Sequence, residues 1–123
     1  MRLFTVEEAN AVLPELQVLL ARIAEERTVL RRFGPEIKRA GEHAAEGGGS
    51  AVGMQYAAAL NRVMADVQEI LGLGVEIKDF DRGLCDFPHL RDGRVVFLCW
   101  QKGEDRIEWW HEVESGFAGR QPL

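Results

Sequence analysis

The residues best suited to chemistry are concentrated in the C-terminal block, residues 75–123. This block contains all three Trp, both Cys and two of the three His residues. Carboxylate and imidazole groups are ligands that zinc, manganese and iron accept in proteins. Those in the block are Asp79, Asp81, Asp86, Glu108, His111 and Glu112. Two of these carboxylates with His111 would make a divalent-metal site.

The spacing of these residues does not by itself identify a metal site. The sequence contains no CxxC or HExxH pattern, and no paired Glu-x-x-His of the kind found in helical bundles. His111 and Glu112 are adjacent on an expected strand, so their side chains point to opposite faces and do not readily share an ion. We therefore expect no cofactor, and a divalent metal remains the alternative.

The same block gives only weak evidence for catalytic residues. Cys99 and His111 have the residue types of a nucleophile and its base. Cys99, however, lies within the apolar run VVFLCW, where a buried and inert thiol is the usual outcome. Acid–base chemistry by Asp86 and His111 is chemically allowed, but the sequence does not fix their geometry. We assign no catalytic residue and expect a protein that is not an enzyme.

Several arginines accompany these residues near the expected turns. Arg82, Arg91 and Arg120, together with Trp110 and His111, could form a pocket for a phosphate or carboxylate. The alternative, which we favour, is a structural network that holds the loops and the tail. In that network the arginines pair with Asp81, Asp86, Asp92 and Glu108.

The block that positions these side chains has the two-residue period of β-strands. Val75 and Ile77 begin a strand, Leu84–Phe87 forms a short strand that ends at Pro88, and further strands cover Val95–Trp100 and Arg106–His111. Ser115–Leu123 shows no period, so we expect an ordered tail. One sheet face covers the helices. The other is partly exposed and carries either Trp110 with carboxylates or Trp109 with His111.

The first half of the chain is helical. Thr5 and Glu8 have capping-box spacing, and Pro14 then predicts either a short first helix or a kink at the start of a long one. A seven-residue apolar repeat follows, made of Leu16, Ile23, Leu30 and Ile37. Glu26 interrupts this stripe, so it resembles a coiled coil without being a clean coiled-coil seam. Gly34-Pro35 is a second interruption, where the helix either kinks or stops.

A second long helix is predicted from about Ala51 to Leu71, with Gly72 as its left-handed cap. The glycine-rich segment 46–50 that joins the two helices is expected to be a flexible tip. Two helices of this kind form an antiparallel hairpin that cannot bury both apolar faces alone. A homodimer that packs four helices is therefore expected.

Composition narrows the function classes. The 123 residues form one domain, with the helical hairpin in residues 1–72 and the strands and tail in 75–123. The net charge of −5 makes nucleic-acid binding unlikely, because phosphate neutralisation needs clustered positive charge. No apolar run is long enough to span a membrane, and no signal peptide is recognisable. A cytoplasmic location with reduced cysteines is expected.

Three stretches resemble an uncharacterised bacterial family, domain of unknown function 2203. They are FTVEEANAVLPEL, GVEIKDFDRGLCDFPHLRDGRVVFLCW and WWHEVESGFAGRQPL. The resemblance spans nearly the whole chain and implies no established activity. The matching signature positions are Asp81, Gly83, Asp86, Phe87, Pro88, Arg91, Gly93, Cys99, Trp100, Glu108, Trp110, His111, Gly116, Phe117 and Arg120.

These observations predict an α+β fold: a long antiparallel helical hairpin with a kinked start, then a three- or four-stranded antiparallel meander and an ordered tail. The leading functional hypothesis is a non-enzymatic homodimeric interaction module that presents a patch of Asp, Arg, Trp and His to a protein partner. The alternative is an anion or divalent-metal site, possibly enzymatic, built from the same residues. The candidate residues are Asp81, Asp86, Arg91, Glu108, Trp110, His111 and Arg120.

Overall fold

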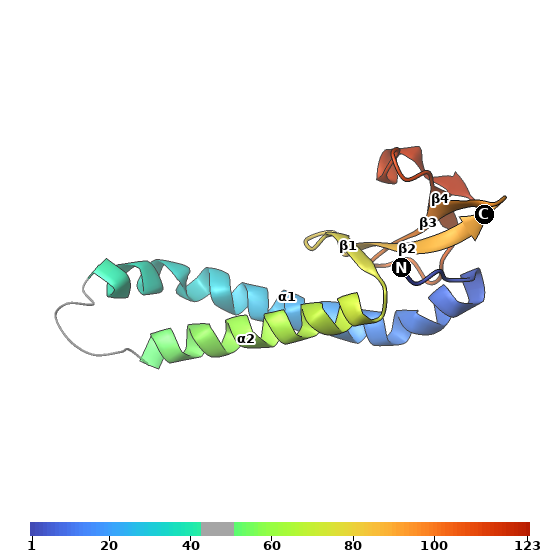
Figure 1. The fold of residues 1–123 in the computed structure, drawn as a ribbon. Coiled ribbons are helices and arrows are strands. Elements are labelled where there is room, and N and C mark those ends of the chain that lie inside the picture. Colours follow the sequence, from blue (N-terminus) through green and yellow to red (C-terminus); the bar gives the residue numbers. More distant parts are fainter. Residues whose placement is uncertain (43–50) are drawn as a thin grey trace.

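The fold is the predicted helical hairpin followed by an antiparallel sheet (Figure 1). A computed structural model describes residues 1–42 and 51–123, so the predicted glycine-rich tip at 46–50 lies outside the described residues. The elements in chain order are α1 (Val6–Glu42), α2 (Ala51–Gly72), β1 (Glu76–Asp79), β2 (Leu84–Arg91), β3 (Arg94–Gln101), β4 (Trp109–His111), the 3-10 helix η2 (Phe117–Gly119) and β5 (Gln121–Pro122). No described helix is both long and apolar enough to cross a bilayer.

The start of α1 confirms the predicted capping box. The Thr5 backbone N–H donates to Glu8 Oε1 at 2.9 Å, and the Glu8 N–H donates to Thr5 Oγ1 at 3.0 Å. Both Pro14 and Pro35 lie inside this one helix, so the alternatives of a separate first helix and of a stop at Gly34-Pro35 are wrong. Each proline removes one backbone hydrogen bond, a cost that the rest of a 37-residue helix can absorb. The first turns of α1 are inclined to the remainder (Figure 1).

The end of α2 differs from the prediction in one detail. Gly72 is the last helical residue, but the left-handed conformation belongs to Gly74, with φ of 92°. The Leu73 and Gly74 N–H groups still donate to the carbonyls of the last turn. The chain therefore leaves the helix two residues later than a cap at Gly72 would place it.

The sheet has five antiparallel strands in sequential order, rather than three or four. The additional strand is β5, in which Trp109 pairs with Pro122 and Trp110 with Gln121. The predicted last strand, Arg106–His111, is shorter than expected and begins at Trp109. A two-residue strand has no detectable period in sequence, so the tail was identified as ordered but not as part of the sheet.

The prediction that Pro88 ends its strand is wrong, because β2 continues to Arg91. In the register of the sheet β1 pairs only with Leu84–Asp86, so Pro88 lies beyond the end of that neighbour. Its carbonyl accepts the Phe4 N–H at 2.7 Å, on the side of β2 away from β3. A proline is tolerated there because no strand requires the missing N–H.

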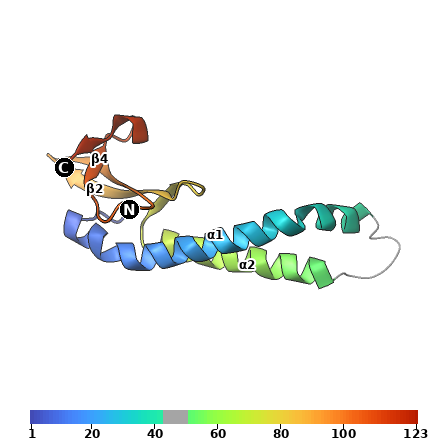
Figure 2. The same ribbon diagram turned by 180° about the vertical axis from the view of Figure 1, so that it is seen from behind.

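The sheet has an inner face toward the hairpin and an outer face away from it (Figure 2). The inner face joins the helices in one apolar core, to which the sheet contributes Cys85, Phe87, Val96, Leu98, Trp100 and Trp110. Alternation along the strands places Asp86, Phe97, Cys99, Trp109 and His111 on the outer face. Of the two sets of residues predicted for the face away from the helices, Trp109 with His111 is therefore the correct one. Trp110 is only 5% exposed.

Within the described residues, two ion pairs join the helices of the hairpin. Arg22 on α1 contacts Asp66 on α2 at 2.6 Å, and Arg62 on α2 contacts Glu26 on α1 at 2.7 Å. They differ in burial, because Asp66 is 3% exposed while the second pair lies at the surface. A buried carboxylate requires its partner far more than an exposed one does.

Removing the partner of the buried carboxylate should destabilise the hairpin. We expect Arg22→Met to lower the free energy of unfolding by about 2 kcal/mol, because Asp66 is left buried and unpaired. The matched control, Arg62→Met, should cost clearly less, since the Glu26 side chain is 20% exposed and can be hydrated more easily than Asp66. Urea denaturation of both variants measures the difference. Equal losses would contradict this account of Asp66.

The capping box should make stability depend on pH. Hydrogen bonds from the Thr5 backbone and then from its hydroxyl lower the pKa of Glu8 below its ordinary value. Its contribution is therefore complete above the unfolded-state pKa and is lost as pH falls through the folded-state pKa. We expect Glu8→Gln to be less stable than wild type at neutral pH, and the gap to close as the pH falls through the lowered pKa of Glu8. A Glu7→Gln control should show a smaller gap in the same denaturation series.

Candidate functional site

Three polar side chains from adjacent strands meet on the outer face of the sheet. They are Asp86 on β2, Cys99 on β3 and His111 on β4, and each is at most 2% exposed. Asp86 is paired directly with Cys99 in the register, and His111 is paired with Phe97, two residues before Cys99. Residues in these positions share one face and approach closely. We call these three residues the outer-face cluster.

Hydrogen bonds fix the orientation of the His111 ring. Nδ1 lies 2.7 Å from the backbone carbonyl oxygen of Glu112, and Nε2 lies 3.0 Å from Asp86 Oδ2. A carbonyl oxygen only accepts, so Nδ1 must carry a proton. Nε2 therefore faces Asp86 with one further proton between the two groups. Either His111 is an imidazolium that donates to a carboxylate, or a neutral His111 accepts from a carboxylic acid.

Asp86 is the member of the cluster whose hydrogen-bonding capacity is not filled. Burial raises its pKa above the ordinary value, although the His111 hydrogen bond and the positive charges of His111 and Lys78 act in the opposite direction. The Cys99 thiol, a weak donor, has the smallest effect on it. Asp86 Oδ1 is buried and has no hydrogen-bond partner among the described residues. A buried acceptor without a donor is rare and calls for an explanation.

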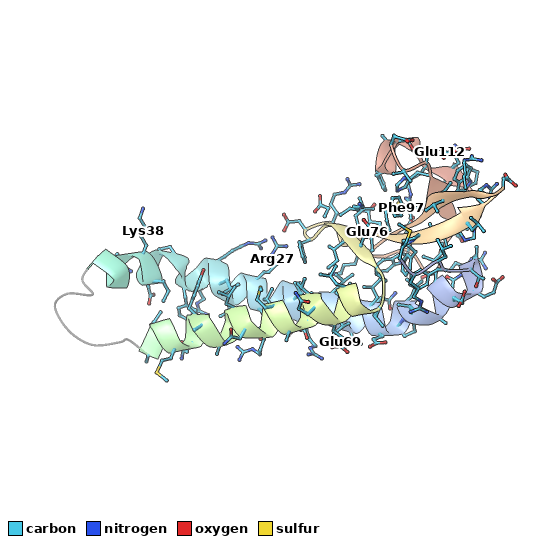
Figure 3. The ribbon with its side chains drawn as sticks, in the orientation of Figure 1. Arg27, Lys38, Glu69, Glu76, Phe97 and Glu112 are labelled. Atoms are coloured by element: carbon cyan, nitrogen blue, oxygen red, sulfur yellow. The ribbon has the colours of Figure 1, made fainter. Side chains whose placement is uncertain are left out.

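A pocket of about 260 Å³ opens beside the cluster. Asp86 and His111 form part of its wall, with Lys78 at the strand β1 side. The opposite wall is the segment 113–117, which connects β4 to η2 and covers the outer face. Figure 3 shows Phe97 and Glu112 at this end of the molecule, remote from Lys38 on the projecting part of the hairpin. The remaining lining residues are Leu84, Phe97, Val113, Glu114, Ser115, Gly116 and Phe117.

The two cysteines lie on opposite faces of the sheet and are both free thiols. Cys85 faces the core, whereas Cys99 belongs to the outer-face cluster. Burial, followed by the negative charge of Asp86, raises the pKa of each thiol to about 12. Arg120 acts in the opposite direction on Cys99. Neither is therefore a thiolate near neutral pH, and neither is an activated nucleophile.

The seven predicted site residues do not form one site. Asp86 and His111 are together in the outer-face cluster. Asp81 instead contacts α1, where Arg31 and Arg27 approach it at 2.9 and 3.1 Å. Glu108 is exposed and pairs with Arg106 at 2.9 Å.

The other three predicted residues have structural neighbours of their own. The Arg91 guanidinium lies 4.4 Å from the ring centre of Trp110, which is buried in the core. The Arg120 guanidinium pairs with Glu104 at 2.7 Å and lies against Phe117, so it attaches the tail to the turn after β3. Arg91 and Arg120 therefore have structural contacts, but among the described residues neither forms an ion pair with Asp81, Asp86, Asp92 or Glu108, so the predicted partners are wrong.

Cys99 is the member of the cluster that the sequence suggests only as a weak nucleophile and not as a metal or ligand contact. The apolar run around it correctly indicated burial. The signal that would have identified it is the register between two strands, in which Cys99 faces Asp86. Register is set by the turn at Asp92-Gly93, where both residues have positive φ, as in a two-residue hairpin of the I′ type. Counting outward from that turn pairs Asp86 with Cys99.

Comparison with known proteins gives a family and no activity. A family model described as "Uncharacterized conserved protein (DUF2203)" matches residues 2–123, so the chain belongs to this family. The resemblance noted in the sequence is thereby confirmed. No curated protein and no solved structure matches the chain.

The burial of both thiols should be visible in their reactivity. We expect neither Cys85 nor Cys99 in the folded protein to react with Ellman's reagent near neutral pH, because each is buried and has a pKa of about 12. Both should react fully once urea unfolds the chain. Absorbance of the released thiolate counts the reactive groups. Rapid labelling of Cys99 in the native protein would show that the cover formed by residues 113–117 opens readily.

Proposed function

We propose that this DUF2203 protein binds a small ligand in the pocket beside the outer-face cluster, which we call the outer-face pocket, with Asp86 as its principal anchor. One observation supports this most directly: Asp86 Oδ1 is a buried acceptor that no described residue satisfies. Such an oxygen costs about 1–3 kcal/mol unless something fills its hydrogen-bonding capacity. The ligand that fits must bring a hydrogen-bond donor or a positive charge to this atom.

The surroundings favour binding over catalysis by the protein's own groups. The pocket combines apolar walls, such as Leu84 and Phe97, with polar groups that could orient a ligand, such as Asp86. The thiol of Cys99, which lies next to the pocket but not in its wall, has a pKa of about 12 and is not an activated nucleophile. The two free thiols also agree with the cytoplasmic location that we propose for the protein.

A ligand panel tests this proposal. We expect at least one member of a panel of divalent cations and small organic amines to raise the melting temperature of the wild-type protein. The same compound should have little effect on Asp86→Asn, which lacks the anionic anchor. Asp81→Asn is the matched control, since Asp81 contacts α1 rather than the pocket, and it should respond as wild type does. Absence of any shift across the panel would contradict the proposal.

A second candidate function, self-association into a homodimer, is favoured by the surface of α2. The exposed residues that follow one side of this helix carry no charge, and they are Ala57, Leu60, Asn61, Met64, Gln68 and Leu71. We call this set the outer face of α2. Leu60, Met64 and Leu71 are 42%, 54% and 50% exposed. Large exposed apolar side chains in one row are typical of an interface.

The charged residues of α2 lie on its other side. Arg62 and Asp66 bind α1, and Glu69 follows Asp66 by one turn, near the sheet end of the helix (Figure 3). A partner for the outer face must therefore be apolar as well. A second copy supplies the same surface, and two such helices can pack about a two-fold axis as in a four-helix bundle.

A charge placed in the middle of this face should prevent self-association. We expect the wild type to have the native mass of a dimer and Met64→Glu to be a monomer, because the new carboxylate would be desolvated at the interface. Val18→Glu is the matched control, since Val18 is equally exposed but lies on α1. Sedimentation velocity distinguishes the species. A monomeric wild type, or a dimeric Met64→Glu protein, would contradict the proposed interface.

A further inference from the structure

The chemistry of the outer-face cluster is more specific than that of a general ligand site. Its members offer three different donor atoms: a carboxylate oxygen of Asp86, the sulfur of Cys99 and a ring nitrogen of His111. We propose that these three residues bind a zinc ion, with a fourth coordination position open to the outer-face pocket. This inference rests on the proposed ligand site and names its ligand.

The spacing of the donor atoms suits one metal ion. The three atoms all lie within 4.8 Å of one another, and His111 Nε2 is 3.0 Å from Asp86 Oδ2. Tetrahedral zinc with bonds of about 2.0–2.3 Å places neighbouring ligand atoms about 3.4–3.6 Å apart. The cluster therefore needs movements of roughly 1 Å to close around the ion. Side-chain rotations can supply these without a change in strand register.

The orientation of His111 is that of a metal ligand. Its Nδ1–H donates to the Glu112 carbonyl, so the remaining nitrogen, Nε2, faces the cluster. Metal-bound histidines nearly always donate their other N–H to a carbonyl or carboxylate in this manner, which fixes both tautomer and ring angle. The same Nε2 lies 3.0 Å from Asp86 Oδ2 and within 4.8 Å of the Cys99 sulfur.

Charge within the site also fits a dication. Zinc binds cysteine as a thiolate, so Asp86 and Cys99 together would contribute two negative charges. A Zn²⁺ ion would neutralise both charges. It would also give the Asp86 carboxylate, whose Oδ1 has no hydrogen-bond partner among the described residues, a positive partner. Lys78 lines the same pocket, so its positive charge favours an anionic fourth ligand.

The mixed donor set selects among metals. Magnesium and calcium prefer sites made of oxygen atoms, in six or more positions, and have little affinity for sulfur. One sulfur, one imidazole nitrogen and one carboxylate oxygen suit zinc in a tetrahedral arrangement. Three protein ligands with one open position is the pattern of zinc sites that bind an exchangeable water or ligand.

Metal titration of the chelator-treated full-length protein tests the proposal. We expect one equivalent of Zn²⁺ to bind and to raise the melting temperature, whereas Mg²⁺ should do neither. Co²⁺ in the same site should give the intense visible bands of tetrahedral cobalt and a sulfur-to-metal charge-transfer band. The last band identifies Cys99 as a ligand and does not depend on any activity.

Substitutions in the cluster provide the second part of the test. Asp86→Asn, Cys99→Ser and His111→Gln should each weaken zinc binding by more than about 100-fold, because loss of a direct ligand exceeds the effect of losing an outer partner. Cys85→Ser is the matched control: it alters an equally buried thiol on the neighbouring position of β2, but on the inner face. It should keep the zinc affinity and the cobalt spectrum. Circular dichroism establishes that each variant is folded.

The outcomes separate this inference from the proposed function. Zinc binding that is lost in folded cluster variants and kept in Cys85→Ser supports both. A wild-type protein that does not bind Zn²⁺ but is stabilised by an organic amine through Asp86 overturns the zinc site and leaves the ligand site in place. Zinc binding that survives unchanged in Asp86→Asn and Cys99→Ser overturns the assignment of the ligands. A protein that binds neither zinc nor amine overturns both.

Discussion

The contact between the inner face of the sheet and the hairpin is the one on which the remaining structure depends. It merges side chains from α1, α2 and three strands into a single apolar core that includes Leu16, Ile70, Phe87 and Trp100. Because side chains alternate along a strand, committing one face to this core assigns every second residue to the other face. The outer-face cluster and its pocket are therefore consequences of how the core is packed.

A polar cluster that is excluded from the core still has to be kept from solvent, and the tail provides that cover. After β4 the chain crosses the outer face, forms η2 and returns as β5 along the edge of the sheet. Arg120 attaches this segment to Glu104, whose backbone carbonyl also accepts the Trp100 indole N–H at 2.9 Å. Burial of Asp86 and His111 is costly unless they share a proton or bind a cation. The proton between Asp86 and His111 meets part of this cost, and the tail leaves Asp86 Oδ1 buried without a hydrogen-bond partner among the described residues.

The two ends of the molecule present different chemical surfaces. The sheet end carries the buried polar cluster and a dense network of arginines paired with acidic or aromatic side chains. The hairpin projects beyond the sheet (Figures 1 and 2), and α2 has an exposed side with no charged residue. A ligand site at one end and an association surface along the hairpin can operate without competing for the same residues. The two proposals are therefore physically independent.

The sequence by itself determined the local features of this protein. Interactions between near neighbours set the capping box at Thr5 and Glu8, the two helices, the turn at Asp92-Gly93 and the change from a helical to a two-residue period.

Tertiary structure decided the rest. Whether a proline ends a helix or strand depends on the structure around it. Here α1 continues through Pro14 and Pro35, and β2 continues through Pro88. Two strand pairings brought the outer-face cluster together. Asp86 pairs with Cys99, 13 residues further along the chain, and Phe97 pairs with His111, 14 residues further along. The same long-range packing separated Asp81, Arg91 and Glu108 from it, because a list of residue types holds no information on register.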